Sequence, residues 1–189
     1  ALGASAAVDY LPWFQTDARV MSDDDVVTSE LKQVFFASSG AITLKKDAKT
    51  TLTPLITSSV KSSLQDLKLI MTRPNPLAVL EGFKADNTKH VLAARVQGPV
   101  KTAFPDGPPK LEGEKKEDRD KVVKAHLAES KESVNLILVA DTDMLADRFW
   151  TQTQDFFGRK MVIPTSSNGD FVTNSVDNLT GSNALISLR

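Results

Sequence analysis

The strongest structural signal in the sequence is an almost unbroken apolar run from Val134 to Ala140, in which Asn135 is the only polar residue. The run has the length of a strand and shows no alternation between polar and apolar residues. Such a pattern is typical of a strand that is buried on both faces, as central strands of parallel sheets are. We therefore expect this segment at the centre of a largely parallel sheet.

The residues after this run alternate between helix and strand patterns. A helix is expected from Asp143 to Gly158, with Leu145, Phe149 and Phe156 on one face. A short strand at Met161–Ile163, a helix from Asp170 to Gly181 and a last strand at Leu185–Leu188 follow. Strands that alternate with helices predict an α/β fold, with a mixed, largely parallel sheet sandwiched by helices.

The first half of the chain predicts shorter elements. The acidic run Asp23–Asp25 precedes a helical spacing that reaches Val34, and Asn75 with Pro76 is a typical start of a helix that ends at Gly82. Strands are expected on both sides of a turn at residues 38–40 and at residues 52–57, 67–71 and 90–97.

Composition limits the classes of function. The chain has 189 residues, a formal net charge of -1 and no cysteine. This length fits a single domain, and the absence of cysteine excludes thiol nucleophiles and thiolate metal sites. The balanced charge argues against a dedicated binder of nucleic acid or of anionic membranes.

One stretch is far richer in charge than the rest. Residues 110–132 contain seven basic and seven acidic residues, after a turn around Pro105–Pro109. Mixed charge of this density is typical of a solvated loop or helix, and Val122, Val123 and Leu127 favour a helix in the second part. We expect a single domain over residues 1–189 that carries this loop and helix as an insertion at about residues 105–132.

Polar residues after the strongest strand are candidates for a binding site. Asp141 and Asp143 follow that strand directly, where open α/β sheets bind ligands. An Asp-x-Asp pair at this place resembles the phosphoaspartate enzymes of the haloacid dehalogenase type, in which the first Asp attacks phosphorus beside Mg²⁺. Leu145 departs from that motif, and the competing interpretation is that Asp141 ends the strand and Asp143 caps a helix. With Ser167 and Asn168 of a later loop, these two residues form a possible ligand or partner contact.

Other catalytic and metal-binding patterns are absent from the sequence. His90 and His126 lie far apart, the Asp141 segment lacks the Gly and Glu of a calcium loop, and there is neither a G-x-S-x-G nor a phosphate-binding glycine motif. We therefore expect no catalytic residue, no cofactor and no metal ion.

The order of several segments resembles the GldG-like family, which comprises auxiliary components of gliding-motility-type ABC transporters. The segments are Tyr10–Trp13, Asp24–Thr28, Ala37–Ala41, Thr53–Ser59, Ala93–Gly98, Thr102–Gly107, Val139–Asp147, Asn168–Phe171 and Asn178–Gly181. They extend over nearly the whole chain.

The resemblance implies a fold and a setting. The fold would be an α/β sandwich of the flavodoxin-like or glutamine-amidotransferase-like kind, without the amidotransferase chemistry, which requires a cysteine. The chain would be a soluble piece of a longer protein, anchored by parts absent from it and facing the periplasmic side of the bacterial inner membrane. Its partners would be the ATPase and permease subunits of the same transporter.

These observations leave three functional hypotheses. The first is a non-enzymatic extracytoplasmic interaction domain of a transporter auxiliary subunit. The second is a periplasmic solute- or glycan-binding module that uses the Asp141–Asp143 strand end and the loop at residues 166–169. The third is a Mg²⁺-dependent phosphatase that uses Asp141 and Asp143.

Overall fold

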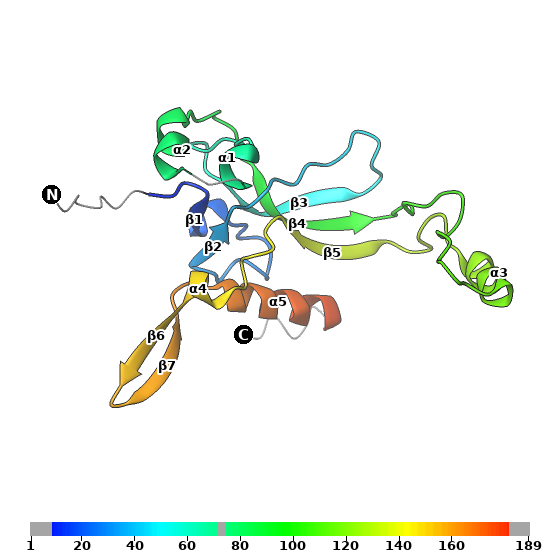
Figure 1. Cartoon of the computed structure of the whole chain (residues 1–189). Helices are drawn as coiled ribbons and strands as arrows, with labels where there is room; N and C mark the ends of the chain where they lie inside the picture. Colours follow the sequence, from blue (N-terminus) through cyan, green and yellow to red (C-terminus); the bar gives the residue numbers. More distant parts are fainter. Residues whose placement is uncertain (1–8, 72–74, 182–189) are drawn as a thin grey trace. The chain divides into compact units, whose positions relative to one another are not determined.

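The computed structural model describes residues 9–71 and 75–181, which form two compact units (Figure 1). Unit 1 contains the described residues within 1–43, 54–94 and 137–189, and unit 2 contains residues 44–53 and 95–136. The expected single domain with an insertion at about residues 105–132 stays a prediction.

Unit 1 begins with a two-stranded antiparallel sheet of β1 (Trp13–Asp17) and β2 (Gln33–Ala37). A single turn of 3₁₀ helix, η1 (Ala18–Val20), follows β1, and the Asp17 carboxylate caps it by accepting from the Arg19 N–H at 3.0 Å. In β2, Val34 and Phe36 are fully buried. Since alternate residues of a strand point to the same face, these two side chains direct one face of β2 into the core.

The hydrophobic core belongs to unit 1 and collects residues from distant parts of the chain. Full burial of a side chain such as Phe36 or Phe171 stabilises the fold by about 2–3 kcal/mol. The buried residues of this core are Met21, Val27, Leu31, Val34, Phe36, Leu55, Ile56, Leu92, Ala93, Met144 and Phe171.

A three-stranded sheet contains β3 (Thr51–Thr57), β4 (Val91–Gly98) and β5 (Val134–Val139), with β4 in the middle. Leu92 to Val96 of β4 are all buried, as expected for a central strand. Each of the three strands has residues in both units. The strands expected at residues 52–57, 90–97 and 134–140 are therefore confirmed as strands.

The helices are short, apart from α5. They are α1 (Lys68–Met71), α2 (Pro76–Gly82), α3 (Lys116–Ala125), α4 (Asp147–Trp150) and α5 (Asn168–Thr180). The predicted start of α2 is confirmed, since Asn75 caps it by accepting from the Ala78 N–H and Pro76 is its first residue. No helix in the described ranges is long and apolar enough to cross a membrane.

A second hairpin in unit 1 joins β6 (Thr151–Phe156) to β7 (Arg159–Pro164) in antiparallel register. Phe157 and Gly158 form its two-residue loop, and both have positive φ, at 53° and 79°. Positive φ at both loop residues is the type I′ geometry that suits tight hairpins. Every residue from Gln152 to Thr165 is exposed.

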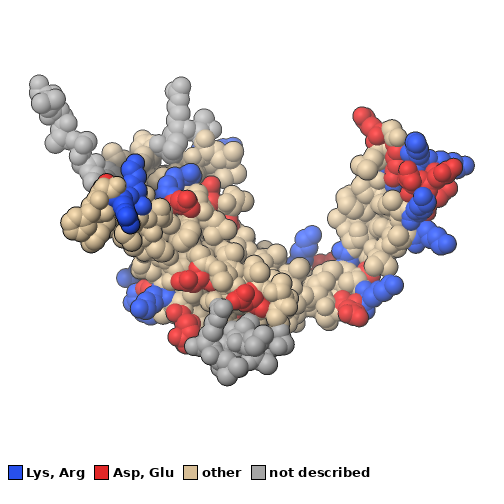
Figure 2. All heavy atoms as spheres, turned by 90° about the horizontal axis from the view of Figure 1, so that it is seen from below, with Lys and Arg blue, Asp and Glu red and all other residues tan. Residues whose placement is uncertain are grey.

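Unit 2 contains the charged stretch. Figure 2 shows basic and acidic side chains mixed over the outer surface of this charged region, and α3 has no buried residue. The helix expected in the second part of the stretch is confirmed. The loop before it is tied to the helix by Arg119, whose guanidinium donates to the carbonyls of Pro108 and Pro109 at 2.6 and 2.9 Å.

The expected fold class is wrong. The sheets have two, three and two strands and are antiparallel, so the described chain is neither a largely parallel sheet sandwiched by helices nor a flavodoxin-like or glutamine-amidotransferase-like fold. β5 lies at one end of its sheet, and Leu136 and Leu138 are each 42% exposed. An apolar run predicts a strand, but it does not report how many neighbours that strand has.

Four predicted elements also differ from the structure. Residues 143–158 form a turn, α4 and β6 where one helix was expected. The strand expected at residues 67–71 is replaced by α1. Residues 24–30 form turns before β2 where a helix was expected. Between residues 143 and 158, Thr151 and Thr153 favour the extended backbone of β6 over a longer helix. The fourth element is the strand expected after the turn at residues 38–40, where Ile42 forms only an isolated bridge to Val91. The strand expected at residues 185–188 lies outside the described residues.

Candidate functional site

The turn that follows β5 places Asp141 against β2. One carboxylate oxygen of Asp141 accepts from the Ala37 N–H at 2.6 Å, and the other accepts from the Asp143 N–H at 2.8 Å. The preceding residue, Ala140, is held by the Gly40 N–H, which donates to its carbonyl at 2.7 Å. Asp141 therefore connects the end of β5 to the end of β2.

The environment of Asp141 alters its acidity. Burial removes water from the half-buried carboxylate and raises its pKa above the ordinary value, despite the backbone N–H donors that oppose this rise. The nearby charge of Asp143 acts in the same direction as burial. Each oxygen of Asp141 accepts one backbone N–H group, and these two bonds fix the orientation of the carboxylate.

Asn168 is completely buried at the start of α5 and contacts β2 two residues away from the Asp141 contact. Its carbonyl oxygen accepts from the Phe35 N–H at 2.9 Å and from the Ser166 hydroxyl at 2.7 Å. Its amide nitrogen donates to the Phe35 carbonyl at 2.8 Å and to the Met144 carbonyl at 2.7 Å. A side-chain amide has two donors and two acceptor sites, and here all four are used.

Together these contacts complete the second edge of β2. One edge of β2 pairs with β1. Along the other edge, Ser167 N–H donates to the Gln33 carbonyl at 2.8 Å, Asn168 pairs with Phe35, and Asp141 pairs with Ala37. Side chains and one backbone amide thus cover an edge that would otherwise expose unpaired backbone groups. We call Asp141, Ser166, Ser167 and Asn168 the edge cluster.

The remaining predicted residues are less constrained. The Ser167 hydroxyl forms no hydrogen bond among the described residues, although its carbonyl accepts from the Phe171 N–H at 2.9 Å. The Asp143 side chain is 54% exposed and lies 3.8 Å from the Arg148 guanidinium. The structure thus brings Asp141 and Asn168 to the same strand edge and leaves Asp143 at the surface. A ligand or partner contact at these residues stays a prediction.

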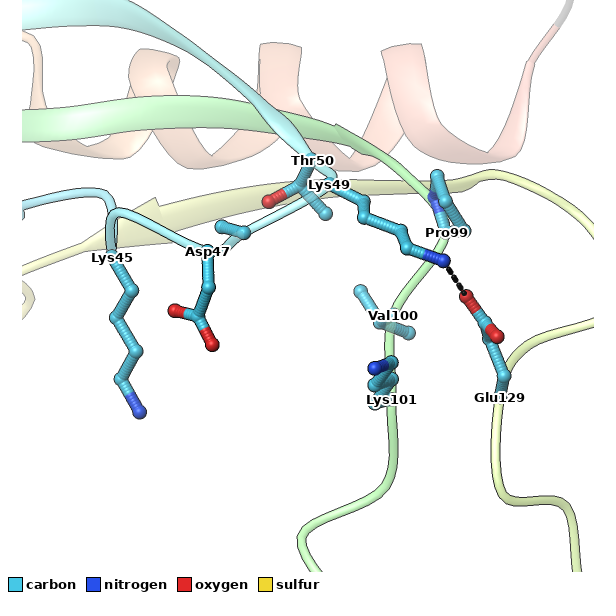
Figure 3. Close-up of a pocket in the computed structure, with 9 residues that line it drawn as sticks. Lys45, Asp47, Lys49, Thr50, Pro99, Val100, Lys101 and Glu129 are labelled. Carbon is cyan, nitrogen blue, oxygen red and sulfur yellow. Dashed lines mark hydrogen bonds and ion pairs between the residues drawn. The ribbon is translucent and has the colours of Figure 1, made fainter.

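Unit 2 has a shallow cavity of about 270 Å³ (Figure 3). Its charged lining is Lys45, Lys49, Lys101, Asp47 and Glu129, which leaves a small excess of positive charge. Lys49 and Glu129 form an ion pair at 3.3 Å, and both are well exposed to water. None of these charged groups is buried, so the cavity lacks the desolvated polar group that usually orients a ligand.

A close backbone approach shapes this cavity. Gly98 has a φ of +120°, and a Cβ at this position would lie 3.1 Å from Thr50 Cα and 3.2 Å from the Lys49 carbonyl oxygen. Only glycine adopts this φ without strain while it allows the two segments to approach. Sequence reasoning missed this position, because a glycine at the end of a strand is also typical of an ordinary turn.

The two histidines are not placed for metal binding. His90 Nε2 lies 2.8 Å from the Asp86 carboxylate, whose pKa is lowered first by the Thr88 N–H and also by His90. His126 belongs to unit 2 and follows α3. Across the described residues, no three His, Asp or Glu side chains converge on a common point.

Comparison with known proteins yields one match. A family model described as an ABC-type uncharacterized transport system matches residues 2–175. No curated protein and no solved structure matches the chain.

Proposed function

We propose that this chain, which belongs to the family described as an ABC-type uncharacterized transport system, is a non-enzymatic interaction domain of an auxiliary subunit. An accessory role in ABC transport follows from the family. The proposal adds that the domain faces the extracytoplasmic side of the membrane and contacts the ATPase and permease of a gliding-motility-type system.

The observation that best supports a non-enzymatic role is the bonding of the edge cluster. Asp141 and Asn168 are two of the four residues predicted to contact a ligand or partner, and their side chains are engaged in structural hydrogen bonds to β2. Neither side chain is paired with a nucleophile or a base in the manner of a catalytic group. An interaction domain needs surfaces instead, and exposed apolar side chains such as Leu64, Leu67 and Met71 are available in unit 1.

Affinity capture tests the proposed partners. The full-length protein, tagged and extracted in mild detergent, is expected to carry with it the ATPase and permease of one transport system. The control is an unrelated protein of the same membrane with the same tag. Capture that yields neither subunit above this control would contradict the proposal.

The proposed side of the membrane can be tested with a single cysteine. The 189 residues contain no cysteine, and Glu112 is exposed in unit 2. In a full-length Glu112→Cys protein with every other cysteine replaced, a maleimide that cannot cross membranes should label intact cells at the extracytoplasmic side. Labelling that appears only after lysis would place the domain on the opposite side.

The solute- or glycan-binding alternative has a different signature. A ligand present at 100 times its dissociation constant should stabilise the fold by about 2.7 kcal/mol, which a thermal-shift screen detects. If sugars, peptides and metal ions leave the melting temperature unchanged, this alternative fails. A hit that disappears in Asp143→Ala would favour it over the interaction domain.

A further inference from the structure

We propose that the end of the β6–β7 hairpin inserts its aromatic side chains into the surface of a lipid bilayer that contains anionic lipid. The hairpin tip is defined here as residues Phe156 to Lys160. The proposal goes beyond the proposed function and depends on it in one respect, because a transport-system component works beside a membrane.

The aromatic residues of the hairpin tip have no packing partner in the core. Phe156 is 60% exposed and Phe157 is 93% exposed. The two rings contact each other edge to face, with centroids 5.0 Å apart. Strands of six residues place the tip about 20 Å from the base of the hairpin. The two rings can therefore contact a surface that the residues before β6 do not touch.

The backbone at Phe157 is unusual for its residue type. Its φ of 53° lies in the left-handed region, where asparagine and glycine are favoured and a bulky side chain is strained. A phenylalanine at this position therefore weakens the turn and contributes no burial in return. Strain of this kind, retained at an exposed site, points to a role outside the folded chain itself.

Two cations follow the rings directly. Arg159 lies opposite Phe156 in the hairpin register, and Lys160 lies opposite Asp155. In the described part of the chain, neither Arg159 nor Lys160 forms an ion pair with an acidic side chain. The Asp155 carboxylate accepts from the Gly158 N–H at 2.8 Å and so stabilises the turn.

This order of groups matches the order of layers at a bilayer surface. Aromatic rings favour the boundary between headgroups and acyl chains, and Lys and Arg extend toward lipid phosphates. The tip projects as a convex end with rings first and cations one and two residues later, which suits a flat anionic surface. Exposed Met161, beside the cations, adds apolar area at the same level.

Vesicle binding tests this proposal. The chain is mixed with vesicles of phosphatidylcholine alone or of phosphatidylcholine with phosphatidylglycerol, and the bound fraction is measured by co-sedimentation. We expect binding to the anionic vesicles, a loss of about tenfold in Phe156→Ser/Phe157→Ser, and loss of the anionic preference in Arg159→Gln/Lys160→Gln.

The matched control removes two exposed apolar side chains elsewhere. Leu77 and Leu80 of α2 are 53% and 42% exposed, and Leu77→Ser/Leu80→Ser should bind vesicles like the parent chain. A second readout is Phe157→Trp, whose difference fluorescence relative to the parent should shift to the blue with vesicles and be quenched by brominated lipid.

Each contrary result overturns the proposal. The proposal fails if the parent chain does not bind vesicles, or if Phe156→Ser/Phe157→Ser binds them as well as the parent does. It also fails if the fluorescence of Phe157→Trp does not shift when vesicles are added. Self-association or capture of a transporter subunit that requires the two rings, without vesicle binding, assigns the tip to a protein partner instead. Capture of the ATPase and permease in detergent involves no bilayer, so the proposed function can succeed when this proposal fails.

Discussion

At the scale of single residues, Asn168 is a fully buried polar side chain whose four hydrogen bonds connect the start of α5 to β2 and to the turn after β5. Asn168→Ala would leave two donors, the Phe35 N–H and the Ser166 hydroxyl, and two acceptors, the carbonyls of Phe35 and Met144, without their partner in a buried site. We expect a loss of about 3 kcal/mol in the free energy of unfolding, measured by urea denaturation. Asn174→Ala is the control, because Asn174 forms one 3.3 Å bond to Val27, and it should cost less than about 1 kcal/mol. Equal losses would show that the amide of Asn168 is not special.

Asp141 predicts a pH dependence whose sign follows from burial. Because its pKa is raised in the folded state, the folded chain binds the proton more tightly than the unfolded chain. The contribution of Asp141 to stability therefore increases as the pH falls from the raised pKa toward the ordinary aspartate range. Denaturation of the parent and of Asp141→Asn over this range should show the parent gaining relative stability at the lower pH. A difference that is constant with pH, or that moves the other way, would contradict the assignment.

The candidate site was predictable in part at this scale. Asp141 follows a strand, as the sequence predicts, whereas Asn168 is the first residue of α5 and does not lie in the loop before the helix, where it was expected. Their common target, β2, was expected as the strand before the turn at residues 38–40 and is confirmed, but its contacts with Asp141 and Asn168 could not be predicted. Hydrogen bonds between residues more than one hundred positions apart leave no local pattern in a sequence.

At the scale of elements, the approach of β4 to the segment before β3 depends on Gly98. Gly98→Ala adds a Cβ within 3.2 Å of two backbone atoms at a φ of +120°. The matched variant is Gly107→Ala, whose φ is +110° with open space around the site. Both variants should destabilise through strain of about 1–3 kcal/mol, and Gly98→Ala should be the more destabilising in urea denaturation. Equal effects would mean that the close approach costs nothing.

The strained turn of the β6–β7 hairpin predicts that a substitution at Phe157 can stabilise the hairpin. Phe157→Asn relieves the left-handed strain, and we expect the hairpin to gain about 1 kcal/mol. Amide hydrogen exchange at Gln154 and Met161, which lie opposite each other, should slow accordingly. Phe156→Asn is the control, since Phe156 belongs to the strand, and it should not slow the exchange. Faster exchange in Phe157→Asn would show that the phenylalanine stabilises the turn.

The errors at this scale have one physical origin. Leu145, Phe149 and Phe156 share the spacing of a helix face, yet Thr151 and Thr153 between them favour an extended backbone. The apolar run at residues 134–140 was taken to be buried on both faces, but Leu136 and Leu138 of β5 are each 42% exposed. Periodicity reports local preference, whereas pairing and burial depend on the partners that the rest of the fold supplies.

At the scale of the whole molecule, the family was predictable and the fold was not. The order of weak segments pointed to an ABC transporter auxiliary component, and the family match over residues 2–175 confirms this coarser identity. The α/β architecture that the resemblance implied is wrong, because the described strands form small antiparallel sheets. Segment order identifies relatives even where the length and pairing of individual elements are misread.

The central claim is that the chain acts by physical contact with one ABC transporter. Crosslinking in intact cells, followed by identification of every protein attached to the full-length chain, tests it most directly. The account predicts that the ATPase or permease of a single transport system dominates the attached proteins. Crosslinks that are spread over unrelated membrane proteins, with no transporter subunit enriched, would contradict it.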